Sequence, residues 1–222
     1  MKIEVSNIKK SYGRNEILKD ISFSAESGKC IGVLGKNGCG KSTLLSVLAG
    51  VQKPDGGSFT MDGHSLFGSP SLLRKNVGYV PQGTPLIDEL TAYDNLLLWY
   101  SRDDLKRELD GGVLSMLGVG DFLKKRVDSL SGGMKKRLSI GCAMFEHPPV
   151  LLLDEPCAAL DIECKENILS YLRDYKARGG VLLLTTHDEM ELSLCDECRI
   201  MRRGVLYQYD YDGDISRLVK NL

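Results

Sequence analysis

The chain has 222 residues, of which 42% are hydrophobic and 27% charged, a globular composition that excludes disordered and fibrous proteins. Its 29 Lys and Arg against 30 Asp and Glu give a formal net charge of -1, which argues against a broad nucleic-acid surface, so no nucleic-acid partner is expected. Apolar runs stay well below the ~18 residues of a membrane span, and the opening residues MKIEVSNIKK do not resemble a signal peptide, so we expect a cytoplasmic protein.

The first elements predicted along the chain are strands. Lys2–Ile8 and Ile21–Ala25 alternate apolar and polar residues, as half-buried strands do. Cys30–Leu34 is a short apolar run, typical of a buried strand. The residues Lys41–Ala49 then have helical spacing, and Gly50 is a suitable stop.

The middle of the chain changes from strands to helices. A strong turn signal at Pro54–Gly57 is followed by a short strand at Val77–Val80. Thr91 has the character of a helix N-cap, and Ala92–Tyr100 and Asp103–Leu117 have helical spacing with no strand between them. We interpret this section as a helical subdomain.

Strands alternate with helices again in the last third. Strands are predicted at Val150–Leu153 and Val181–Thr185, with a helix at Ile162–Lys176 between them. Arg199–Gln208 is predicted to be a hairpin, followed by a short terminal helix. This alternation predicts an α/β fold with a mainly parallel sheet covered on both faces.

Residues 35–42 read GKNGCGKS and fit the phosphate-binding pattern G-x-x-x-x-G-K-[ST]. Glycines let the backbone wrap a phosphate chain with its N–H groups pointing inward, and the following helix adds its positive end. Lys41 can then reach the β and γ phosphates, and the Ser42 hydroxyl can ligate Mg²⁺. A chance match is the alternative, but the preceding strand and following helix favour nucleotide binding. The predicted phosphate-binding residues are Gly35, Lys36, Asn37, Gly38, Cys39, Gly40, Lys41, Ser42 and Thr43.

A carboxylate pair follows a predicted strand. Val150–Leu153 leads to Asp154, predicted to hold the metal, often through water. Glu155 comes next and is predicted to orient or deprotonate the attacking water. On its own this pair is better explained as a strand-ending turn. Together with the phosphate loop it favours ATP hydrolysis.

The segment Leu130–Met134 reads LSGGM and resembles the signature motif of ABC-type ATPases, the nucleotide-binding subunits of ABC transporters. The resemblance covers essentially the whole chain. It implies a P-loop NTPase of ABC type, with a mainly parallel sheet core, an antiparallel β subdomain and a helical subdomain. Within a single domain over residues 1–222, it places the RecA-like core and the β subdomain in 1–84 and 130–222, and the helical subdomain in about 85–129.

Further positions match the family's functional residues in order. Tyr12 matches the aromatic residue that stacks on adenine, and Gln82 the glutamine that touches Mg²⁺ and the water. His187 matches the histidine that contacts the γ-phosphate. The segment Ala158–Asp161 matches the loop that crosses the dimer interface, and Asp161 is its predicted site residue. Singly, each suits an ordinary structural role, such as a surface aromatic or a helix cap. The ordered set favours the functional interpretation.

The signature motif implies a second subunit. Ser131 and the backbone N–H groups of Gly132 and Gly133, at the start of a helix expected to run to about Glu146, form an anion site. In the family, this site caps the γ-phosphate bound by a partner. The resemblance therefore implies ATP and Mg²⁺ as cofactors, a head-to-tail partner that is identical or paired, and integral membrane permease subunits that hold the chain at the cytoplasmic face of the membrane.

Some positions depart from the commonest pattern. Met134 replaces the usual glutamine of the signature, and Cys157 and Ala158 replace hydroxyl residues, which removes a possible hydrogen bond across the interface. LSGGMKKR is similar to the signature of the export-type subfamily, which includes drug and antibiotic efflux ATPases.

Three functions are consistent with these motifs. A transporter motor is the leading hypothesis. The second is a soluble ABC ATPase in DNA repair, chromosome handling or translation, but such relatives generally carry coiled-coil or zinc insertions or two ATPase domains, which this sequence lacks. The third is a non-hydrolysing regulatory ATP binder, against which Glu155 and His187 both argue.

Overall fold

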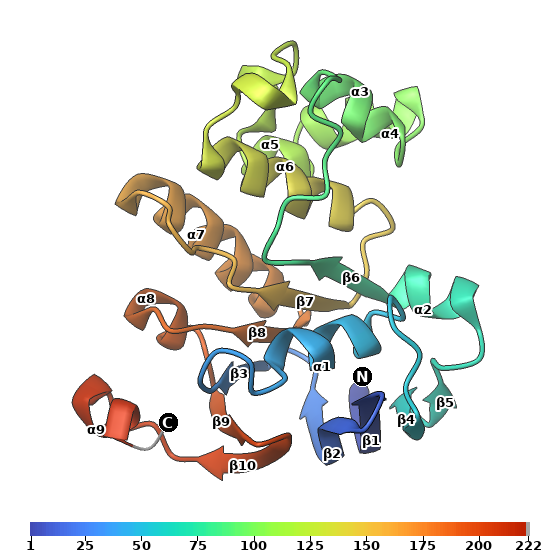
Figure 1. Cartoon of the computed structure of the whole chain (residues 1–222). Coiled ribbons are helices and arrows are strands. Elements are labelled where there is room, and N and C mark those ends of the chain that lie inside the picture. The colour runs from blue at the N-terminus through green and yellow to red at the C-terminus, as the bar shows by residue number, and fades with distance from the viewer. Residues whose placement is uncertain (221–222) are drawn as a thin grey trace.

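The computed structural model describes residues 1–220, apart from the side chains of Ile215, Ser216 and Val219. Its larger sheet comprises β3 (Cys30–Leu34), β6 (Val77–Val80), β7 (Val150–Asp154), β8 (Val181–Thr185), β9 (Glu197–Arg202) and β10 (Val205–Tyr209). The strand order is β10-β9-β3-β8-β7-β6, and every pairing is parallel except that of β10 with β9. The predicted α/β fold with a mainly parallel sheet is confirmed, as is the hairpin that turns at Arg203 and Gly204 (Figure 1).

The hydrophobic core lies on both faces of this sheet. Every residue of β3, β7 and β8 is buried. Alternate residues of these strands contribute to separate clusters, because successive side chains of a strand point to opposite faces. One cluster contains Leu151, Leu153, Leu182 and Leu184, and the other contains Val150, Leu152, Val181 and Leu183. The continuous apolar runs in the sequence therefore reflect strands covered on both sides.

A second, antiparallel sheet lies beside the first (Figure 1). It has the order β2-β1-β4-β5 and comprises β1 (Lys2–Tyr12), β2 (Asn15–Glu26), β4 (Gly56–Met61) and β5 (His64–Ser65). The predicted strands at Lys2–Ile8 and Ile21–Ala25 were too short. Register shifts in the pairing of β1 with β2 break the period-two alternation, so the sequence pattern ends before the strands do.

The helices α3 to α6, in the upper part of Figure 1, differ in length from the prediction. Instead of one helix over Asp103–Leu117 there are two, because Gly111 has a φ of +154°, outside the helical region, and Gly112 is extended. The other helices predicted here also end earlier than expected, before Tyr100 and Glu146. The observed helices are α3 (Ala92–Leu97), α4 (Arg102–Leu109), α5 (Val113–Met116) and α6 (Gly132–Ala143), with short 3-10 turns at Val119–Phe122 and Val127–Ser129.

The remaining helices connect or cover the strands. The predicted helices after the glycine-rich loop and between β7 and β8 are confirmed, with small differences in their ends. α2 was not predicted, and neither were the two strands before it, β4 and β5. These helices are α1 (Lys41–Leu48), α2 (Pro70–Asn76), α7 (Ile162–Ala177), α8 (Glu189–Leu192) and α9 (Ile215–Lys220). Within residues 1–220, no helix has the length and apolar character needed to cross a bilayer.

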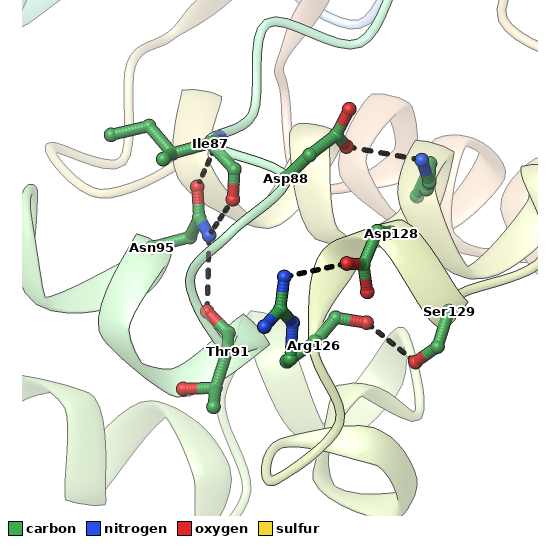
Figure 2. Close-up of polar contacts among 8 residues, drawn as sticks. Ile87, Asp88, Thr91, Asn95, Arg126, Asp128 and Ser129 are labelled. Atoms are coloured by element: carbon green, nitrogen blue, oxygen red, sulfur yellow. Dashed lines mark hydrogen bonds and ion pairs between the residues drawn. The ribbon is translucent and has the colours of Figure 1, made fainter.

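The segment that precedes α3 is tied to that helix by Asn95 (Figure 2). Asn95 is 2% exposed, and its Nδ2 donates to the carbonyl oxygens of Ile87 and Thr91, both at 3.0 Å. Its Oδ1 accepts from the Ile87 amide at 2.8 Å. The predicted cap is confirmed, because Thr91 Oγ1 accepts from the Asp94 amide at 3.1 Å. One buried amide therefore fixes the backbone of the segment.

Replacing Asn95 with alanine is expected to lower the free energy of unfolding by about 1–3 kcal/mol, because it leaves backbone groups of Ile87 and Thr91 without their partner. Urea denaturation of the purified chain measures this change. The matched control is Asn167→Ala on the exposed surface of α7, where we expect less than about 0.5 kcal/mol. Equal unfolding midpoints for the two variants would contradict the expectation.

Candidate functional site

The loop between β3 and α1 turns at positions that favour glycine. Gly38 and Gly40 have φ values of +78° and +114°, and Gly35 has +154°. A Cβ at Gly35 would lie 2.6 Å from the Met201 carbonyl oxygen, so a larger residue would not fit there. The glycines of the motif are therefore explained by the backbone path, which delivers the chain to the N-terminus of α1.

Lys41 holds a buried positive charge at this loop. The residue is 6% exposed, and its Nζ donates to the Gly35 carbonyl oxygen at 2.6 Å and to that of Lys36 at 3.4 Å. A buried ammonium requires such partners. The ammonium and the positive end of α1 together favour the binding of an anion at the loop.

A cavity of about 250 Å³ opens beside the loop. Ile17 is its one lining residue that the sequence analysis missed, since an apolar strand residue carries no chemical signal. Tyr12, 48% exposed at the end of β1, donates its hydroxyl to Gln52 Oε1, and the Lys10 ammonium lies 5.5 Å from its ring centroid. The cavity is lined by Tyr12, Ile17, Asn37, Gly38, Gly40, Lys41, Ser42, Thr43, Gln82 and Glu155.

Thr185, the last residue of β8, fixes both predicted carboxylate residues. Its hydroxyl donates to Asp154 Oδ1 at 2.6 Å and accepts from the Glu155 amide at 3.1 Å. Asp154 is 3% exposed at the end of β7, and Glu155 has a φ of +48°, a conformation that a non-glycine residue adopts only when its surroundings enforce it. Thr185 was not predicted as a site residue, although it ends the strand next to β7.

Three predicted catalytic side chains meet at Glu155. Gln82 Nε2 donates to Glu155 Oε2 at 2.9 Å, and His187 Nε2 lies 4.0 Å from Glu155 Oε1. These residues follow β6, β7 and β8, which are neighbours in the parallel sheet and therefore end at one edge. Burial, with a contribution from Lys41, lowers the pKa of His187 despite the opposing effect of Glu155. The imidazole is therefore neutral at pH 7 and can both donate and accept a proton.

The predicted metal ligands offer hard oxygen donors. Ser42 and Gln82 line the cavity, whereas Asp154 does not line it but is buried directly before the lining residue Glu155 and accepts a hydrogen bond from Thr185. Mg²⁺ in proteins commonly binds one or two carboxylates and completes its shell with phosphate oxygens and water. The hydroxyl, amide and carboxylate oxygens present here fit Mg²⁺ bound jointly with a phosphate chain.

The signature segment lies elsewhere in the chain. Ser131 caps α6, its Oγ accepting from the Met134 amide at 3.3 Å, and both Ser131 and Gly132 are exposed. Gly133 is buried, and a Cβ there would lie 2.4 Å from Cys164 Sγ. None of the described residues 130–134 lines the cavity at the phosphate loop. The two predicted anion sites are therefore not brought together within one copy of the chain.

Asp161 has a local structural role. Its Oδ1 accepts from the Cys164 amide at 2.8 Å and so caps α7, and this hydrogen bond lowers the pKa of the Asp161 carboxyl. Leu160, the preceding residue, lies 3.7 Å from where a Cβ on Gly132 would be. The loop before α7 and the signature segment therefore form one exposed surface.

Comparisons with known proteins relate this arrangement to ATP-binding cassettes. The profile of the family described as ABC transporter matches residues 18–158. The chain is 34% identical to the linearmycin resistance ATP-binding protein LnrL of Bacillus subtilis (strain 168), over 97% of this chain and 71% of that protein. It is 38% identical to the Nod factor export ATP-binding protein I of Sinorhizobium fredii, over 91% of this chain and 60% of that protein.

A solved structure shares the fold over almost its whole length. It is described as the dimeric post-hydrolysis state of an ATP-binding cassette bound to ADP and phosphate. It superposes with a TM-score of 0.82 at 27% identity, covering 94% of this chain and 98% of the other.

Proposed function

Because the chain belongs to the ABC transporter family, as an ATP-binding ATPase of that family, we propose that it hydrolyses Mg-ATP as one of two ATPase subunits that drive export through separate membrane subunits. One observation carries the proposal of a pair. The cavity at the phosphate loop contains the predicted catalytic Gln82 and Glu155, whereas the signature segment does not line it.

In this proposal the phosphate chain lies against Gly35–Thr43, with Lys41 leaving the loop carbonyls to meet the β and γ phosphates. Ser42, Gln82 and Asp154 would hold Mg²⁺, which would neutralise charge on the phosphate oxygens. Glu155 accepts a proton from the attacking water, and Gln82 orients both the water and the Glu155 carboxylate. Tyr12 stacks on the adenine.

The neutral His187 donates a hydrogen bond to the γ-phosphate in this arrangement. Its distance of 4.0 Å from Glu155 places it beside the carboxylate that activates water. Burial first, and then the charge of Lys41, lower the pKa of His187, which favours the neutral imidazole in the nucleotide-free chain.

The second half of each site comes from a second copy of the chain or a related one. Ser131 and the N-terminus of the 12-residue α6 are exposed and can face a γ-phosphate held by a partner. Asp161 borders the same surface. The dimeric cassette that this chain resembles supports such a pair.

We propose that the helical subdomain at about 85–129 faces the membrane. It forms a single ABC domain together with the rest of the chain. Leu98 and Trp99 at the end of α3 are 59% and 50% exposed, unusual for residues of their size, and suit a contact with a permease. The names of the two relatives, a resistance protein and an export protein, support export. A contact with a permease would hold the chain at the cytoplasmic face of the membrane.

Mixing two inactive variants tests the pair. Lys41→Ala damages the phosphate loop, and Gly132→Asp places a negative charge at the signature without removing a buried contact. Each is expected to be inactive alone, whereas a mixed dimer has one intact site. The mixture should recover about a quarter of the wild-type rate, because about half of the dimers are mixed and each has one working site. A mixture as inactive as its parents would contradict the shared site.

A further inference from the structure

Lys136 of α6 is a buried lysine whose partners lie in the loop that carries Gln82. The residue is 4% exposed, a degree of burial that lysine rarely reaches without specific partners. Its Nζ donates to the carbonyl oxygens of Pro81 at 3.1 Å and Gln82 at 3.2 Å. The two acceptors are the residues that directly follow β6. The lysine therefore holds the backbone of this loop at the point where Gln82 leaves the sheet.

The surroundings of Lys136 connect it to the carboxylates of the site. Burial lowers its pKa, and the negative charges of Asp154, Glu191 and Glu155 act in the opposite direction. An ammonium has three donors, of which the two carbonyls use two. The carboxylates and the two carbonyl acceptors reduce the cost of burying this ammonium, although burial remains the larger effect on its pKa.

Gln82 is therefore held at both ends. Its carbonyl accepts from Lys136, and its side-chain amide donates to Glu155 at 2.9 Å. A change in the position of α6 moves the loop through the first bond and the Glu155 carboxylate through the second. Because α6 begins at the signature segment, one rigid helix links that segment to the catalytic carboxylate of the same chain.

Lys135, the residue before Lys136, contacts the segment between β6 and α3 further along, at Asp88. Lys135 Nζ lies 3.1 Å from Asp88 Oδ1, in an ion pair whose carboxylate is 62% exposed (Figure 2 labels Asp88). An exposed pair of this kind contributes little to stability. Within residues 1–220, the Lys135 ammonium pairs with Asp88 and makes no hydrogen bond to the Gln82 backbone, so Lys135 provides a matched control on the same turn of the same helix.

We propose that Lys136 is a positioning residue: it fixes the Gln82 loop so that Gln82 orients Glu155, and it couples this to the signature end of α6. The inference rests on the roles of Gln82 and Glu155 in the proposed function. It assigns to the buried lysine of the segment KK at 135–136 a part in hydrolysis that is separate from nucleotide binding.

Steady-state ATP hydrolysis by the full chain tests this role. Lys136→Met is expected to lower kcat by about tenfold to hundredfold, the cost of displacing a catalytic group by about 1 Å, while KM for ATP stays within about twofold. Lys135→Met should keep the wild-type kcat. Thermal melting of each variant reports whether it folds. Lys136→Gln keeps a hydrogen-bond donor and should recover part of the rate. It replaces Lys136→Met in the comparison if Lys136→Met does not fold.

A double-mutant cycle with Gln82→Ala separates positioning from a general structural effect. If Lys136 acts through Gln82, then Lys136→Met should have almost no further effect on kcat in the Gln82→Ala background. Equal kcat values for Lys136→Met and Lys135→Met would overturn the inference. So would a full loss of kcat on adding Lys136→Met to Gln82→Ala. Either result would leave the proposed function intact. A wild-type kcat for Gln82→Ala would instead remove the proposed role of Gln82, and the inference with it.

Discussion

Replacing Glu155 with glutamine is expected to reduce ATP turnover by about 10²–10⁴-fold, the usual contribution of a general base. Glutamine keeps the shape and the contact with Gln82 but cannot accept the proton of water. The phosphate loop is untouched, so ATP still binds. A pair that binds ATP but does not hydrolyse it should accumulate, since hydrolysis is what removes the bridging γ-phosphate.

Phosphate release measures the turnover of Glu155→Gln, and sedimentation of the ATP-bound protein measures its association. The control is Glu26→Gln, which removes an exposed carboxylate at the end of β2 and should leave both properties unchanged. Wild-type turnover in Glu155→Gln would show that another group activates the water. A monomer with bound ATP would argue against the shared site instead.

Replacing Lys41 with alanine is expected to weaken ATP binding by about 30-fold or more, since loss of a buried charge contact costs about 2 kcal/mol or more. Lys41 is 6% exposed, so its ammonium acts inside the loop and away from bulk solvent. The loss should appear in the dissociation constant itself, in contrast to the effect of Glu155→Gln.

Titration calorimetry with ATP and Mg²⁺ gives the affinity of Lys41→Ala. Lys75→Ala serves as the control, because that side chain is exposed in the last turn of α2 and should not change the affinity. Unchanged affinity in Lys41→Ala would mean that the glycine-rich loop does not hold the phosphates.

The sequence alone predicted the parts of this site that depend on local pattern. The loop at residues 35–42 and the pair Asp154–Glu155 each follow an apolar run, and a parallel sheet places the ends of such strands at one edge. Strand β6 and strand β8 were predicted with their observed bounds for the same reason.

Residues that act through distant partners escaped prediction. Thr185 meets Asp154 over a separation of 31 residues, and Lys136 meets Pro81 over 55. Neither contact follows from a motif or a spacing, because only the strand order and the docking of α6 create them. The register shifts in β1 and the helix break at Gly111 were not predicted for a related reason. A local deviation ends the periodic pattern, and the pattern does not show which structure follows.

The two sheets carry different parts of the proposed site. Tyr12 ends a strand of the antiparallel sheet, whereas the phosphate loop, Gln82, Glu155 and His187 all follow strands of the parallel one. The residue proposed to stack on the base is therefore attached to a different sheet from the groups proposed to act on the phosphate. A substitution at Tyr12 should accordingly change the binding of the base more than the rate of phosphate cleavage.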